Sequence, residues 1–152
     1  MELNSQEPEN TIETTLEKPK AVYSALFVKD IQGLLASFPP KHSKVFASHS
    51  TIGFLPTSLD NIEIGRVGTL KIIGRATDEK GDALFVENPK SKNKFPHITL
   101  SCADGVPPFY SNELLEKASA DGTLELFSAP IDIQIVEGYS DGKNDHITSY
   151  TE

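Results

Sequence analysis

Two four-residue motifs, His49–Ile52 (HSTI) and His97–Leu100 (HITL), contain the residue types of this chain that are best suited to chemistry. Each places a threonine two positions after a histidine, within an apolar run that predicts a β-strand. Because side chains alternate between the faces of a strand, the histidine and threonine of one motif should point the same way. Around one pocket, two such pairs would supply a general acid, a general base and two donors to phosphate oxygens. We therefore predict two catalytic histidines and two phosphate-binding threonines: His49, His97, Thr51 and Thr99.

A third histidine, His146, also has a threonine two positions later. It follows a polar, turn-forming segment, and the fourth position of its motif is serine rather than an aliphatic residue. Strand context therefore separates it from the first two motifs. We interpret the third match as a coincidence.

The paired motifs resemble those of the two-histidine (2H) phosphoesterases, a superfamily that includes LigT-like and eukaryotic cyclic phosphodiesterases. The segment Phe95–Ser101 (FPHITLS) is similar to the second motif of small members associated with RNA repair. The resemblance covers roughly residues 21–139, although the two motifs are only about fifty residues apart. It implies a compact, two-lobed and pseudo-symmetric α+β fold with antiparallel sheets and flanking helices. It also implies that either histidine can serve as the base, so we assign neither role.

Length and composition agree with one globular domain, since 152 residues with 38% apolar content can form a substantial core. No apolar run approaches twenty residues, and no leader of the secretory type opens the chain, so we expect neither a membrane span nor secretion. The single cysteine, Cys102, excludes an intrachain disulfide and favours a reducing, cytoplasmic location. We expect residues 1–20 to form a flexible acidic tail, residues 21–140 the domain, and residues 141–152 a polar tail.

The net charge of −8 restricts the class of ligand. Proteins that track long nucleic acids need a broad cationic face, because neutralisation of phosphates dominates their affinity. This chain has no such excess of Lys and Arg, so we expect a short nucleotide or a single RNA end rather than a duplex. The oligomeric state is left open.

The order of expected elements supports an antiparallel α+β domain rather than a doubly wound sheet. Asp30 is typical of an N-cap, and Gly122 of a residue that ends a helix. The turn-forming segment 78–82 predicts a hairpin. In chain order we expect a strand at 21–28, a helix from 30 to 38, a strand at 45–55, hairpin strands at 69–77 and 83–87, a strand at 95–101, a helix from 111 to about 121, and strands at 124–127 and 131–136.

Further contacts to the substrate are expected near the two motifs. An extended loop would place three alternating lysines, at positions 90, 92 and 94, on one face, where they would attract phosphate. The residues that we expect to touch the substrate are Tyr23, Ser101, Tyr110 and Lys94. No metal and no other cofactor are expected, because no carboxylate-rich or His-x-x-x-His cluster accompanies the motifs.

The sequence therefore predicts a metal-independent phosphodiesterase that acts on a 2′,3′-cyclic phosphate of an RNA end or nucleotide. One alternative is a nuclease that degrades cyclic or 2′–5′-linked oligonucleotide messengers, as viral relatives do against host defence. Another is a non-catalytic module that binds a nucleotide or RNA end.

Overall fold

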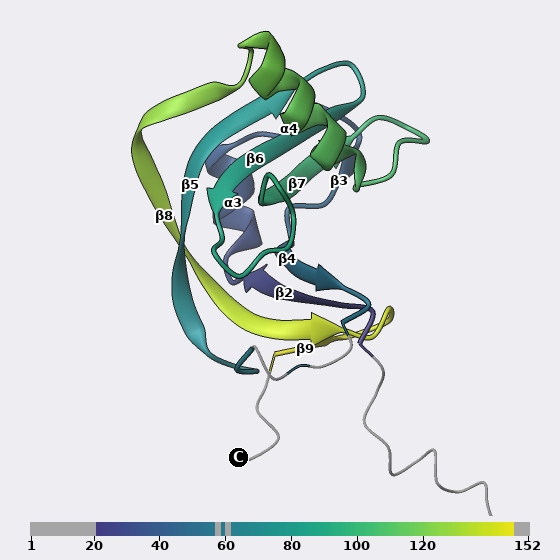
Figure 1. Ribbon diagram of the computed structural model, residues 1–152, viewed down its shortest axis with the longest axis vertical. Helices are drawn as coiled ribbons and strands as arrows, with labels where there is room; N and C mark the ends of the chain where they lie inside the picture. The colour runs from purple at the N-terminus through teal and green to yellow at the C-terminus, as the bar shows by residue number, and fades with distance from the viewer. Residues whose placement is uncertain (1–20, 57–58, 60–61, 148–152) are drawn as a thin grey trace, which may run out of the picture.

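The computed structural model describes residues 21–56, 59 and 62–147. Within this part, eight strands form one sheet and two helices flank it, so the α+β class is confirmed (Figure 1). All strand pairs are antiparallel. In chain order the elements are β2 (Tyr23–Val28), α3 (Ile31–Ser37), β3 (Lys44–Val45), β4 (His49–Phe54), β5 (Val67–Thr77), β6 (Gly81–Glu87), β7 (His97–Cys102), α4 (Tyr110–Asp121), β8 (Glu125–Ser140) and β9 (Asp145–His146).

The sheet curls because β3 and β4, which follow each other closely in the chain, pair with strands at its two opposite ends. The strand order is β3-β7-β6-β5-β8-β2-β4, with β9 beside β8, so β3 and β4 lie at opposite ends although they are neighbours in sequence. The N–H of Ala47 still donates to the Thr99 carbonyl of β7 (2.7 Å), whereas the carbonyl of Ser48 accepts from Val28 at the end of β2 (2.9 Å). Ala47, with a backbone φ of +61°, marks this change of partner. The curl consequently brings β4 into contact with β7.

The hydrophobic core fixes which way the two motif strands face. Ile52 of β4 and both Ile98 and Leu100 of β7 are almost completely buried in one cluster, together with Leu34 of α3. Burying each of these side chains contributes roughly 2 kcal/mol. Because strand side chains alternate, the histidine and threonine of each motif point to the other face.

The second helix, α4, covers a smaller apolar cluster over β6. Its buried residues Leu114, Leu115 and Ala118 pack with alanines of β5 and β6. The helix ends at Gly122, which adopts the left-handed conformation with φ 76°. This packing fixes the first turn of α4 beside β7.

Several predicted elements are confirmed. Asp30 caps α3 by accepting a hydrogen bond from the N–H of Gly33, and β5 and β6 form the expected hairpin. The strand expected at 45–55 is instead divided into β3 and β4 at the change of partner.

The prediction of two strands at 124–127 and 131–136 is wrong, because both belong to the 16-residue β8. Leu126 pairs with Gly74 of β5, and Ile131 pairs with Ile72. Residues 127–130 therefore lie opposite a single residue of β5 and form a bulge. Proline at position 130 lacks an N–H, which suits a bulge and not a regular ladder.

The chain after β8 turns back, and β9 pairs with Tyr139 and Ser140, so residues 141–147 form a hairpin with the end of β8. The tail expected at 1–20 and the last five residues of the expected C-terminal tail lie outside the described residues. In the described part, no helix is long and apolar enough to cross a membrane.

Candidate active site

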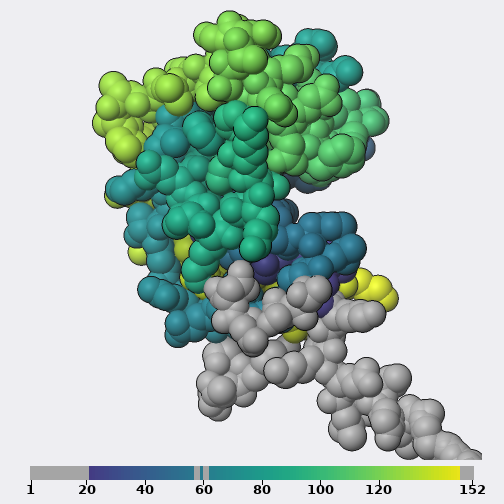
Figure 2. Space-filling model, viewed as in Figure 1, coloured from purple at the N-terminus to yellow at the C-terminus, as the bar shows by residue number. Residues whose placement is uncertain are grey.

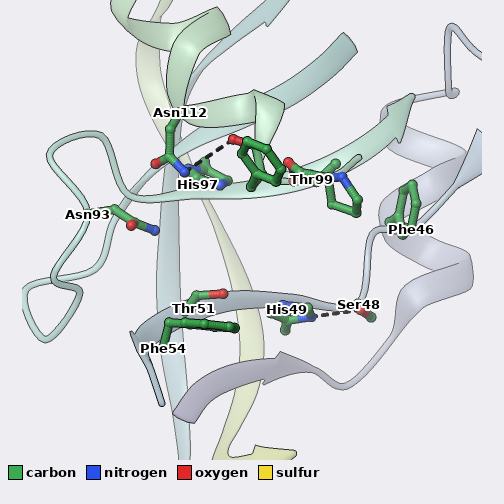
Figure 3. A pocket seen from close by; sticks show the side chains of 11 residues that line it. Phe46, Ser48, His49, Thr51, Phe54, Asn93, His97, Thr99 and Asn112 are labelled. Carbon is green, nitrogen blue, oxygen red and sulfur yellow. Dashed lines mark hydrogen bonds between the residues drawn. The ribbon is translucent and has the colours of Figure 1, made fainter. Parts of the chain in front are cut away.

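The curl of the sheet leaves a cavity of about 240 Å³ between β4 and β7. Figure 2 shows the molecule hollowed at this place, between the blue residues of β4 and the green residues around α4. Both motifs face it, and all four residues predicted to do the chemistry line it (Figure 3). The lining residues are Phe46, Ser48, His49, Thr51, Phe54, Asn93, His97, Thr99, Pro108, Phe109 and Asn112.

His49 is held by an aromatic ring and by a hydroxyl group. The ring of Tyr23 stacks on the imidazole at 4.6 Å between centroids, and Phe27 packs at 5.8 Å. Nδ1 lies 2.9 Å from the Ser48 hydroxyl, which can donate to it or accept from it. Burial, followed by the nearby charge of His97, lowers the pKa of His49 from 6.5 to about 4.

The hydrogen bond to a backbone carbonyl fixes the tautomer of His97. Nδ1 lies 2.8 Å from the carbonyl oxygen of Phe95. Because a carbonyl can only accept, Nδ1 carries the hydrogen, and Nε2 is the basic atom of the neutral ring. Burial lowers the pKa of His97, and the bond to Phe95 opposes that shift.

The two threonines have different surroundings. The hydroxyl of Thr99 donates to the carbonyl of Pro108 (3.2 Å) and lies 2.7 Å from the hydroxyl of Ser111 in the first turn of α4. Thr51 makes no side-chain hydrogen bond within the described part of the chain. The hydroxyl of Thr51 is therefore available to a ligand, whereas that of Thr99 also ties β7 to α4.

The structure does not bring the other predicted contacts into the cavity lining. Ser101 is fully buried and donates to Asp82, and Tyr110 donates to Asp78 (2.5 Å). The hydroxyl groups of both residues are thus engaged in hydrogen bonds within the protein, outside the cavity lining.

Two of the three lysines in the loop before β7 lie beside carboxylate groups. The ammonium group of Lys94 lies 3.6 Å from Glu116 of α4, and that of Lys90 lies 3.0 Å from the buried Glu137 of β8. Both cations thus face carboxylates of the protein instead of the cavity. Tyr23 packs against His49 and is also outside the cavity lining, so within the described part of the chain it supports the imidazole.

Six lining residues were not expected to be in the site from sequence reasoning: Phe46, Ser48, Asn93, Pro108, Phe109 and Asn112. They lie in loops, at strand ends or at the start of α4, where no periodicity marks the direction of a side chain. The sequence feature that could have identified one of them is the position of Ser48 directly before the histidine of the first motif. Phe54 also lines the cavity, and its side chain is 70% exposed.

The cavity contains no permanently charged group among the described residues that line it, which are histidines, hydroxyls, amides, phenylalanines and a proline. In the described part of the chain, no group of three or more His, Cys, Asp or Glu side chains could hold a metal ion. Such a lining suits a singly charged phosphodiester better than a doubly charged phosphomonoester, whose second charge would need a cation.

The sequence matches no protein-family model and no curated protein.

Proposed function

We propose that this protein is a metal-independent phosphodiesterase of the two-histidine type. The observation that carries the proposal is that His49 and His97, from strands at different ends of the sheet order, line one cavity with the threonine of each motif. The leading substrate is a 2′,3′-cyclic phosphate of an RNA end or nucleotide. The curled sheet, which places one motif strand on each side of the cavity, supports a two-lobed 2H-like arrangement (Figure 3).

The pKa values of the two imidazoles suggest how they divide the work. His49, whose pKa is lowered by burial and by the charge of His97, is the neutral ring and takes a proton from water as the water oxygen attacks phosphorus. The imidazolium form of His97 gives its Nε2 proton to the oxygen that leaves as the P–O bond breaks. Thr51 donates to a non-bridging oxygen, where negative charge increases. In the reverse direction, attack by a ribose hydroxyl, the two histidines exchange roles.

Binding of the substrate favours the protonation state of His49 and His97 that this proton transfer needs. In the free protein the pKa of both histidines lies below 6.5, so most molecules have two neutral rings at pH 7. A phosphodiester anion beside them favours the imidazolium form and raises the pKa. The reactive state, with one charged and one neutral ring, therefore becomes more populated once the anion is bound.

The exposed phenylalanines around the cavity support a nucleotide as substrate. Phe46, Phe54 and Phe109 are 37%, 70% and 73% exposed, and exposed apolar side chains at a cavity indicate a binding site. A base can stack on such a ring. The same rings also suit a cyclic or 2′–5′-linked oligonucleotide messenger, which is our second candidate substrate. We propose a cytoplasmic location and a short ligand rather than a long duplex.

A turnover assay by mass spectrometry, with chelator present, tests the proposal. The panel contains 2′,3′-cyclic mononucleotides, an RNA oligomer with a cyclic phosphate end, 2′–5′ oligoadenylate, and cyclic di- and trinucleotides. Turnover that continues in chelator and is lost in His97→Gln supports the proposal, and the substrate consumed identifies the class. Binding of these nucleotides without any turnover would support a non-catalytic module instead.

A further inference from the structure

We propose that Phe54, Asn93 and Asn112 form a nucleobase-binding subsite beside the phosphate position. This inference rests on the proposed function, since it names the group of the substrate that the cavity recognises. Figure 3 shows the three side chains at one end of the cavity, with His97 and Thr51 next to them. Phe46 and Ser48 lie at the opposite end. The two ends therefore differ in chemistry.

Phe54 supplies an open aromatic face. It is the last residue of β4, and the chain bends away directly after it, where Leu55 has a φ of +46° and donates its N–H to the carbonyl of Val22. The ring is left 70% exposed beside the cavity and cannot reach the core. A planar, weakly polar group that stacks on this ring would remove it from water.

Asn93 supplies an amide on a fixed backbone. The loop between β6 and β7 is attached to β4 at two points, since the N–H of Lys92 donates to Ile52 (2.7 Å) and the amide of Asn88 donates to Ser50 (3.1 Å). The N–H of Asn93 donates to the Ser91 hydroxyl (3.1 Å). Its carboxamide is half-buried on the cavity wall and bonds to no other described residue. A half-buried amide that no described residue engages is well placed to bind a polar ligand.

Asn112 supplies a second, oriented amide from α4. Its Nδ2 donates to the carbonyl of Phe109 (3.2 Å), which fixes the side chain and leaves one N–H and the oxygen available. Two carboxamides thus offer both donors and acceptors near one aromatic face. A nucleobase has this combination, with a flat face and an edge of adjacent donors and acceptors.

At the other end of the cavity, the described residues present an aromatic ring and no amide side chain. Phe46 lies there with the Ser48 hydroxyl, which is already engaged with His49. We therefore expect the enzyme to recognise one base, on the Phe54 side of the phosphorus, and to tolerate different groups on the other side. Because the described residues that line the cavity include no permanently charged group, we expect stacking and amide contacts to dominate this recognition.

The test compares a nucleoside 2′,3′-cyclic phosphate with 1-O-methylribose 2′,3′-cyclic phosphate, which lacks the base. The wild-type protein should favour the nucleoside substrate by roughly 10-fold or more in kcat/KM, as expected for loss of one stacked base. Asn93→Leu and Phe54→Leu should move this ratio towards one. Phe46→Leu is the matched control, because it also shortens an exposed ring at the cavity but should keep the ratio. Thermal melts check that each variant folds.

The outcomes separate this inference from the proposed function. If the wild-type protein cleaves both substrates and the variants leave the ratio intact, the subsite is refuted while the phosphodiesterase stands. If nothing is cleaved, the subsite is tested by comparing the binding of the same two compounds, the nucleoside 2′,3′-cyclic phosphate and its analogue without a base, followed by NMR. Preference for the nucleoside that is lost in Asn93→Leu and kept in Phe46→Leu supports it, and the absence of a preference overturns it.

Discussion

Replacing His49 by glutamine should remove a large pH dependence from the stability of this protein. The pKa of the imidazole falls from 6.5 in the unfolded chain to about 4 in the fold, because burial and the charge of His97 disfavour the charged form. Between these values the unfolded state binds more protons, so the free energy of unfolding decreases as the pH falls through 6.5 towards 4. A difference of about 2.5 pKa units corresponds to a loss of about 3 kcal/mol by pH 4.

Urea denaturation at pH 7.5 and at pH 4 measures this loss. We expect His49→Gln to lose about 3 kcal/mol less than the wild-type protein over this interval. Thr51→Val is the control, since it alters the same cavity without removing a titratable group and should show the wild-type pH dependence. Equal pH dependence in the wild-type protein and His49→Gln would refute the argument that His49 is buried neutral.

Three further predictions follow from the site and its supports. First, kcat/KM should be bell-shaped with a maximum on the acid side of pH 6.5, because both free-protein histidines have lowered pKa values and the active pair holds one proton; a maximum above pH 7 in a pH–rate series would contradict this. Second, Thr51→Val should lower kcat on the order of 100-fold with little change in the melting curve. Thr99→Val should in addition lower the free energy of unfolding by about 1 kcal/mol, because it breaks the hydrogen bond to Ser111. Equal unfolding free energies for the two variants would refute this difference between the two threonines. Third, Asp82→Ala should destabilise the fold by about 3–5 kcal/mol in urea denaturation, because it leaves the nearly buried Arg75 without its ion pair; a loss below about 1 kcal/mol would show that the pair contributes little.

The elements that local chemistry specifies could be predicted from the sequence. The cap at Asp30, the turn between β5 and β6 and the glycine at the end of α4 each act within a few residues. The two motif strands could also be predicted, because alternating apolar residues place Ile52 and Ile98 in the core and leave the histidines on the other face.

Features that depend on distant parts of the chain could not be predicted. The separation of β3 from β4 depends on hydrogen bonds to β7 and β2, and nothing between residues 45 and 55 reveals that two different strands pair with this stretch. Lys90 and Lys94 of the loop before β7 seemed free to attract phosphate, but Glu137 and Glu116, far away in sequence, lie beside them. Asn93 and Asn112 also come from separate parts of the chain, and only the fold brings both amides to the cavity wall.

The most direct test of the central claim is a double-mutant cycle on phosphodiester cleavage in the presence of chelator. We expect His49→Gln and His97→Gln each to lower kcat by at least about 100-fold, and the double variant to be no slower than the slower single variant. Non-additivity of this kind is expected when two groups act in one proton exchange. Full additivity, or turnover that either single variant retains, would contradict the account that the two histidines form one catalytic unit.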